Sequence, residues 1–162
     1  MPISQIGQPE FLEIDETLRL RRFDGKYSFA LEWYQDSELV WLVDGVRAAY
    51  DRDKLSRMYR YLDQHGELYF IELLVKGDFV PVGDVCLWPE DLPITISRPY
   101  WKQGIGKRTV IRLIQRAREL GWIQMKVNMI YHYNTASRAL FESVGFRIYE
   151  SNEKGNRFYL DL

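Results

Sequence analysis

The chain has 162 residues and a formal net charge of −1, and 46% of its residues are hydrophobic. This length suits one domain with a substantial core, and the balanced charge argues against a protein that coats nucleic acid. Cys86 is the only cysteine, and His65 and His132 are the only histidines. These counts exclude an intramolecular disulfide and a thiolate metal cluster, and they make a histidine-rich metal site unexpected.

The N-terminal sequence has no basic segment followed by an apolar run, as a signal peptide would have. No apolar stretch approaches the roughly 20 residues that cross a bilayer. We therefore expect a cytoplasmic protein that binds no metal, no nucleic acid and no membrane.

Hydrophobic periodicity and turn residues predict the elements of the chain in order. The group 36–38 is a candidate break in the first helix. The predicted elements are a strand at 18–23, helices at 28–43 and from 51 or 53 to 65, strands at 69–75, 80–88 and 94–97, a helix from about 107 to 120, a strand at 125–130, a helix from 134 or 135 to 145, and strands at 146–149 and 157–160.

Short turns join the strands 69–75, 80–88 and 94–97, which predicts antiparallel pairing. A helical crossover joins 94–97 to 125–130, which predicts that these two strands run parallel. The sequence shows no repeat and no interdomain linker. We therefore predict one α/β domain over 1–162, with a mixed, mostly antiparallel sheet of about six or seven strands flanked by helices.

A glycine-rich loop, 100–108, lies between the strand 94–97 and the following helix. Gly104 and Gly106 have no Cβ, so a ligand can approach the backbone closely. The helix behind them begins with free N–H groups and the positive end of its dipole, which favours a phosphate. The loop lacks the spacing of a P-loop and of a dinucleotide-binding fingerprint. The alternative is an ordinary strand-to-helix turn.

A second motif follows about 30 residues later, with Asn134, Ser137 and the pair Gly145-Phe146. The glycine loop and this motif, in this order and spacing, resemble the GNAT superfamily of acyl-CoA-dependent N-acyltransferases. The resemblance covers about 69–162, and the elements before it match the family in order but not in motif. It implies a GNAT-like fold in which the strands 94–97 and 125–130 splay apart.

The resemblance also implies how acetyl-CoA is held. Backbone N–H groups of the glycine loop would bind the pyrophosphate, and the end of the strand 94–97 would pair with the pantetheine arm as an added strand does. Lys102 or Arg138 would meet a further phosphate, or both are solvated charges. The implied residues are Ile96, Ser97, Lys102, Gln103, Gly104, Ile105, Gly106, Lys107, Asn134, Ser137 and Arg138.

Two positions depart from the family pattern. Trp101 stands where the family often has Arg or Gln. Phe141 stands where it often has a Tyr that protonates the leaving thiolate. Tyr131 and Tyr133 are the nearest substitutes in sequence, although both are equally suited to packing. The alternative is a thiolate that leaves without assistance.

Acetyl transfer to an amine requires a group that accepts a proton, because amines with a pKa of about 10.4 are mostly charged at neutral pH. Glu90 and Asp91 precede the strand 94–97 and are the candidate bases, or both are turn residues. Cys86 as an acyl-carrying nucleophile is a weaker alternative to a buried core position.

In the family, the first two helices build much of the acceptor pocket. Trp33, Asp36 and Trp41 lie there, and Asp84 lies on a neighbouring strand, as an acceptor contact or a structural partner. These aromatic and acidic residues favour a small cationic amine such as an aminoglycoside or polyamine. The alternatives are a protein N-terminus or lysine as acceptor, and a non-catalytic coenzyme A-binding module. The sequence leaves open whether the protein forms a homodimer.

Overall fold

The structure, a computed structural model, describes residues 7–162, so the extreme N-terminus that bears on the signal-peptide expectation lies mostly outside it. The strands are β1 (Phe11–Glu13), β2 (Leu18–Arg22), β3 (Glu67–Val75), β4 (Asp78–Leu87), β5 (Ile94–Ile96), β6 (Gln124–Tyr131), β7 (Arg147–Ser151) and β8 (Gly155–Asp161). The α-helices are α1 (Ser37–Asp44), α2 (Arg52–His65), α3 (Ile105–Glu119) and α4 (Thr135–Ser143). Three 3-10 turns are η2 (Ser28–Ala30), η3 (Trp33–Gln35) and η4 (Arg98–Tyr100).

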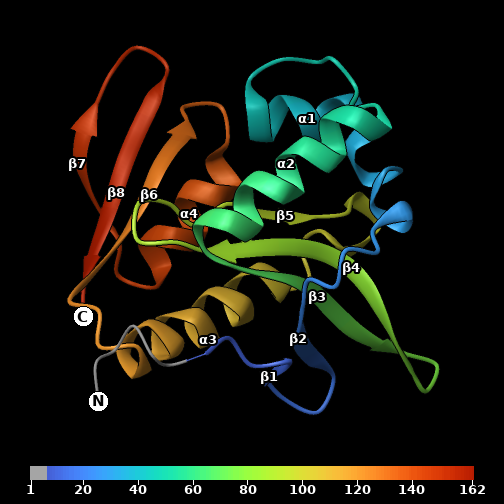
Figure 1. The fold of residues 1–162 in the computed structure, drawn as a ribbon. Helices are drawn as coiled ribbons and strands as arrows, with labels where there is room; N and C mark the ends of the chain where they lie inside the picture. The colour runs from blue at the N-terminus through green and yellow to red at the C-terminus, as the bar shows by residue number, and fades with distance from the viewer. Residues whose placement is uncertain (1–6) are drawn as a thin grey trace.

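The strands form two hydrogen-bonded groups, β1-β2-β3-β4-β5 and β6-β8-β7 (Figure 1). Every pair within them is antiparallel. β5 and β6 share no backbone ladder, so the sheet is open between them. The prediction of a mixed, mostly antiparallel sheet flanked by helices is confirmed. The additional strand is β1, which is too short to show alternation in the sequence.

The predicted helix at 28–43 is wrong in its first half. The chain makes the two 3-10 turns η2 and η3 there, and a regular helix begins only at Ser37. Asp36 causes the interruption because its Oδ1 accepts the N–H groups of Glu38 and Leu39 at 3.1 and 3.3 Å. This side-chain cap starts α1 within the candidate break at 36–38.

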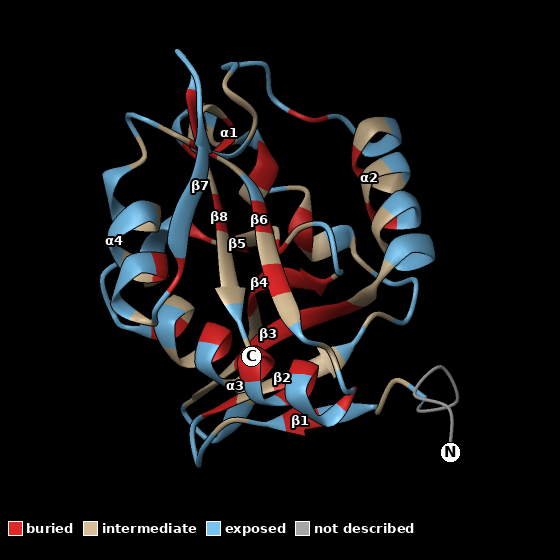
Figure 2. Ribbon diagram, turned by 90° about the vertical axis from the view of Figure 1, so that its left-hand side faces the viewer, coloured by how far each residue is buried: buried red, intermediate tan, exposed pale blue. Residues whose placement is uncertain are grey.

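Helices cover both faces of the large sheet, and β3 shows the alternation that builds two cores. Leu68 and Phe70 pack with α1 and α2, whereas Tyr69 and Ile71 pack in the core that includes α3 and α4. Figure 2 shows the buried residues concentrated along the central strands, with exposed residues on the outer sides of the helices. The open junction between β5 and β6 therefore lies inside a layered structure.

The arginines of α3 tie the helix to the first strands. Arg108 forms an ion pair with Asp15, with its Nε 2.9 Å from Oδ2. Arg112 donates to a backbone carbonyl of β1, and Arg116 pairs with Glu67 at 2.7 and 3.0 Å while only 6% exposed. Much of the positive charge of this helix therefore serves the fold.

Candidate active site

The opening between β5 and β6 contains a narrow cavity of about 110 Å³, here called the slot. A larger hollow of about 480 Å³ lies at the β1–β2 edge, but none of the predicted motif residues lines it. The slot brings together the approach to β5, the bulged end of β6, and α1 and α4. Its lining residues are Leu42, Val43, Asp91, Leu92, Pro93, Ile94, Val127, Met129, Ile130, Asn134, Ser137 and Phe141.

The backbone of β5 presents alternate residues to this opening. The Ser97 N–H donates to Val82 O at 2.8 Å, and Pro93 O accepts the Cys86 N–H at 3.0 Å, so these residues bond to β4. By the alternation of an antiparallel ladder, the N–H and C=O groups of Ile94 and Ile96 point away from β4, toward the open side. This orientation is the one that the predicted pairing of Ile96 with the pantetheine arm requires.

Ser97 has no free backbone group in this structure with which to pair with the pantetheine arm, as the sequence had predicted it would. Its N–H bonds to β4, and its C=O accepts the Tyr100 N–H at 3.0 Å. The Ile96 carbonyl also has a partner, because the Trp101 indole N–H donates to it at 2.6 Å. Trp101, the departure from the family pattern, thus covers the end of β5.

The two glycines of the loop have different structural roles. Gly104 is the residue before α3 and has φ +76°, a left-handed conformation that glycine adopts without strain. A Cβ placed on Gly104 would meet no atom within 4 Å, so the loop is open there. A Cβ on Gly106 would lie 2.7 Å from Leu140 Cδ1, so this glycine lets α3 approach α4.

The first turn of α3 leaves N–H groups for an anion. The first helical bond from this end is Arg108 N–H to Gly104 O at 3.1 Å, which leaves the N–H groups of 105–107 without partners inside the helix. The first turn contains no acidic residue, and Lys102 and Lys107 are exposed beside it. These are the groups on which the prediction of a phosphate cradle depends, and the cradle stays a prediction.

Gln103 and Arg138 have other partners in this structure. The Gln103 side chain donates to Pro99 O at 3.2 Å. Arg138 pairs with Glu142 one turn away on α4 at 2.6 Å, an exposed pair of small energetic value. A phosphate at Arg138 would therefore have to displace Glu142.

Asn134 and Ser137 of the second motif lie at the wall of the slot. Asn134 Oδ1 accepts the Ser137 N–H at 3.2 Å and so caps α4. Its Nδ2 donates to Leu42 O of α1 at 3.3 Å. Phe141 lines the same wall and is 2% exposed, so the position of the family tyrosine faces the slot without a hydroxyl. Ser137 supplies the hydroxyl among the lining residues.

Tyr131 and Tyr133 contact α1 and are not among the lining residues. The Tyr131 hydroxyl donates to Asp44 O at 3.1 Å, and the Tyr133 hydroxyl donates to Trp41 O at 2.7 Å. The Tyr133 ring also stacks on Trp41 with centroids 4.5 Å apart. The Tyr131 phenol satisfies the last carbonyl of α1, and the Tyr133 phenol adds a second donor to Trp41 O, which also accepts the Gly45 N–H. Of the candidate hydroxyl groups, that of Ser137 therefore belongs to a residue that lines the slot, whereas those of Tyr131 and Tyr133 do not.

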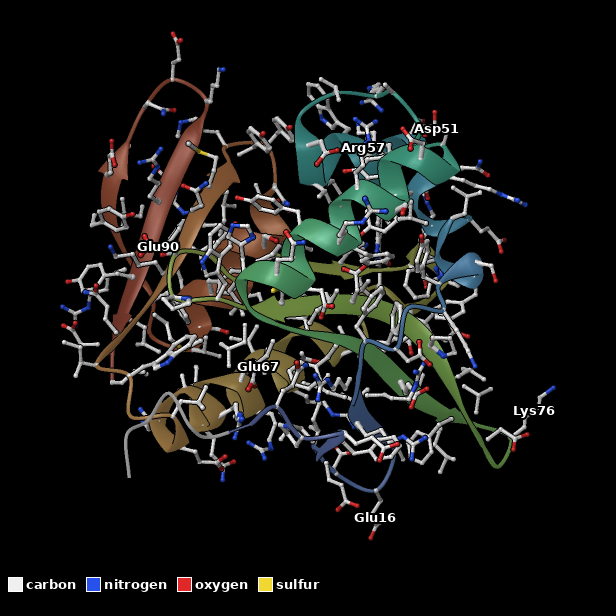
Figure 3. The ribbon with its side chains drawn as sticks, in the orientation of Figure 1. Glu16, Asp51, Arg57, Glu67, Lys76 and Glu90 are labelled. Carbon is white, nitrogen blue, oxygen red and sulfur yellow. The ribbon has the colours of Figure 1, made fainter. Side chains whose placement is uncertain are left out.

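The structure separates the two candidate bases. Asp91 lines the slot, and its Oδ1 accepts the N–H groups of Leu92 and Asn128 at 2.8 and 2.9 Å. Burial raises the pKa of this carboxyl, and the two hydrogen bonds oppose the rise. Glu90 is exposed on the turn between β4 and β5 (Figure 3). Asp91 alone combines slot access with a raised pKa.

The four predicted acceptor residues do not line the slot. Trp33 packs against Phe29 with centroids 5.6 Å apart, and Trp41 is stacked on Tyr133. Asp36 caps α1 and forms a two-pronged ion pair with Arg98 at 2.5 and 2.6 Å, which lowers the pKa of its carboxyl. These aromatic and acidic side chains pack η3 and α1 against the rest of the fold.

Asp84, the fourth of these residues, is only 4% exposed. The hydroxyls of Tyr34 and Tyr59 each donate to its Oδ2 at 2.7 Å. Burial raises the pKa of Asp84 to about 6, although both hydrogen bonds act to lower it. In this structure Asp84 is therefore a structural partner of the two tyrosines, which was the alternative to a contact with the acceptor.

Cys86 is fully buried, and its thiol donates to Leu62 O at 3.5 Å. Burial, followed by the charges of Asp84, Asp91 and Asp63, raises the pKa of the thiol to about 12. A thiol in this state is a poor nucleophile at neutral pH. The structure thus favours the core reading of Cys86.

Comparison with known proteins agrees with this geometry. The sequence profile of the acetyltransferase (GNAT) family matches residues 11–146, and the chain belongs to this family. The predictions of a GNAT fold and of an acetyl-CoA-dependent N-acetyltransferase are thereby confirmed at the level of the family. No curated protein matches the chain in sequence.

Solved structures share the fold at low sequence identity. A domain from Methanocaldococcus jannaschii has a TM-score of 0.77 and 17% identity, covering 91% of this chain and 100% of that one. A GNAT acetyltransferase from Bacillus anthracis has a TM-score of 0.74 and 15% identity, covering 92% and 95%. RimL, a ribosomal L7/L12 α-N-protein acetyltransferase in complex with coenzyme A, has a TM-score of 0.71 and 15% identity, covering 94% and 98%.

Within residues 7–162, His, Cys, Asp and Glu side chains form no group of three or more that could hold a metal ion. In the same part of the chain, the helices are too short or too polar to cross a membrane.

The buried Asp84 gives stability a pH dependence that can be measured. Its pKa is raised to about 6 in the folded state, so its contribution is fully present below the unfolded pKa of about 3.9 and is lost as pH rises through 6. We expect the free energy of unfolding of the wild type, relative to Asp84→Asn, to fall by about 2 kcal/mol between pH 4 and pH 7.5. Urea unfolding of both proteins measures this difference, and a gap that is independent of pH contradicts it.

Proposed function

We propose that the protein transfers an acetyl group from acetyl-CoA directly to the primary amine of a small cationic molecule, without an acyl-enzyme. The observation that carries the proposal is the slot, because it holds Asp91 and Ser137 between the open edge of β5 and the second motif. The unreactive state of the Cys86 thiol supports direct attack.

The residues present fit acetyl-CoA. The pyrophosphate would bind at the N–H groups of 105–107, where Gly104 leaves open space and Lys102 and Lys107 add positive charge. The pantetheine arm would lie along β5, where the N–H and C=O of Ile94 and the N–H of Ile96 face the opening. Asn134 would bond to the same arm once its amide releases Leu42 O.

Two side chains of the slot have distinct chemical tasks. Asp91 accepts a proton from the attacking amine, directly or through one water, and its raised pKa suits this task better than that of an exposed carboxylate. Ser137 donates a hydrogen bond to the sulfur as the carbon–sulfur bond breaks. Because a thiolate is a good leaving group, a hydrogen bond to the sulfur is sufficient and a full proton transfer is not required.

The glycine loop is tested by two substitutions of nearly equal shape. Gly104→Asp and Gly104→Asn both place a side chain at φ +76°, and Asn and Asp tolerate this conformation better than other residues. Only Asp adds a negative charge beside the phosphates. We expect Asp to weaken acetyl-CoA binding at least tenfold more than Asn, measured by calorimetry with circular dichroism as a control for folding. Equal affinities would show that the loop is only a turn.

Turnover is tested with acetyl-CoA and a panel of small amines, while free thiol is followed. We expect acetylation of cationic primary amines, and we expect Asp91→Asn to lower kcat by about a hundredfold or more. Asn retains an Oδ1 acceptor for the N–H groups of Leu92 and Asn128, so the fold is retained. The wild-type rate should rise as pH rises through the raised pKa of Asp91. Binding of acetyl-CoA without turnover across the panel would identify a coenzyme A-binding module instead.

The role of Ser137 predicts a drop in kcat without a change in acetyl-CoA affinity. Ser137→Ala removes the hydroxyl, while the backbone N–H that binds Asn134 remains. We expect kcat to fall about tenfold, equivalent to one hydrogen bond to a charged group. Phe141→Tyr in the same background restores a hydroxyl at the wall of the slot and should recover part of the rate. An unchanged kcat in Ser137→Ala means that the thiolate leaves without assistance.

A further inference from the structure

We propose that an aromatic surface at the Asp91 end of the slot selects diamines over monoamines. The surface consists of Tyr61 and His65 at the end of α2 and Trp88 at the end of β4, and is here called the α2–β4 surface. This inference rests on the proposed function and assigns its acceptor specificity to residues outside the predicted acceptor set.

The three aromatic rings form one cluster. Tyr61 and His65 stack with centroids 4.0 Å apart, and Trp88 lies 5.1 Å from the His65 ring and 5.9 Å from the Tyr61 ring. His65 Nδ1 donates to Tyr61 O at 2.7 Å, which fixes the imidazole and leaves Nε2 for a ligand. Tyr61 is 50% exposed, so the cluster is accessible from solvent.

Backbone pairing places this cluster beside the proposed base. Trp88 and Asp91 are directly opposite each other in an antiparallel bridge, and residues paired in this way project to the same face. Asp91 itself lines the slot. An amine held at Asp91 therefore lies beside the edge of the α2–β4 surface, and the remainder of the molecule can extend over it.

The charges around the surface favour a second cation. From residue 61 to residue 97 the only Lys or Arg is Lys76, at the tip of the β3–β4 hairpin, far from Glu90 in Figure 3. Asp63, Glu90 and Asp91 carry negative charge near the cluster, and Asp63 and Asp91 both act on the buried Cys86 thiol. Aromatic rings add attraction for an ammonium group through their faces.

Two of the cations on neighbouring elements, both on α2, point away from the surface. Arg57 and Arg60 contact Asp53 and Ser56, toward the start of α2. Lys126 alternates along β6 with Val127, which packs in the core that includes α3 and α4, so Lys126 projects to the face of the sheet that carries α1 and α2. A ligand with two ammonium groups thus meets acids at one end and aromatic rings with acids at the other, while Lys126 is a cation on the same face of the sheet.

The test compares diaminobutane with butylamine as acceptors, because the two differ by one amino group. For the wild type we expect kcat/KM to be at least tenfold higher for diaminobutane. Trp88→Leu should remove most of this preference, whereas Trp88→Phe, which keeps an aromatic face, should retain most of it. Neither change should alter kcat/KM for butylamine more than about threefold.

Charge is tested with exposed residues, so that folding is not at risk. Asp63→Asn should lower the preference for diaminobutane a fewfold, and Glu16→Gln, on the opposite side of the molecule in Figure 3, should not change it. Reduced preference in Asp63→Asn supports the proposal even where Trp88→Leu is poorly folded.

The outcomes separate this inference from the proposed function. Equal use of both amines by the wild type, or a preference that survives Trp88→Leu and Asp63→Asn, overturns the selective surface while leaving the acetyltransferase intact. A lysine-containing peptide used at least tenfold better than diaminobutane also overturns it. Absence of turnover with every amine, with acetyl-CoA still bound, means that the proposed function itself has failed.

Discussion

The missing backbone ladder between β5 and β6 is the feature on which the rest of the structure depends. A buried strand must satisfy its N–H and C=O groups, yet Ile94 and Ile96 turn theirs toward an opening and not toward another strand. The Trp101 indole satisfies one of these groups in this structure. The others form a strand edge that an extended chain with amide groups can complete. The fold thus maintains an unfinished sheet at the place where the family binds an acyl donor.

Helix α1 couples this opening to the acceptor side, because both of its ends are attached to donor-side residues. At its start, Asp36 pairs with Arg98, which follows β5 directly and lies over the Trp101 ring. At its end, Tyr133 and Asn134 donate to its last carbonyls, and Asn134 is also the predicted pantetheine ligand. Asn134 thus connects the predicted ligand site to the end of α1, whose residues Leu42 and Val43 form a wall of the slot.

The donor half of the site could be predicted from the sequence because it depends on local backbone features. Gly104 and the cap residue Asn134 act through their own turns and helix ends, so spacing along the chain was sufficient to place them. The acceptor half depends on which side chains meet across elements. Trp33, Trp41 and Asp84 have the right chemistry for a cation, but packing and two tyrosine hydroxyls occupy them. Apart from turn residues, nothing in the sequence indicated that Trp88 and Asp91 would lie opposite each other.

The position of Phe141 shows why residue type alone is a poor guide to the chemistry of the slot. It lines the cavity where the family often places a phenol, and its contact with Phe146 makes it part of the core. Losing that hydroxyl removes one proton donor but leaves Ser137, one helical turn earlier, on the same wall. Residues four apart on a helix share a face, so the helix offers two places for a hydroxyl at the wall of the slot. The wall of α4 therefore keeps one residue with a hydroxyl on the lining of the slot even though the family tyrosine is absent.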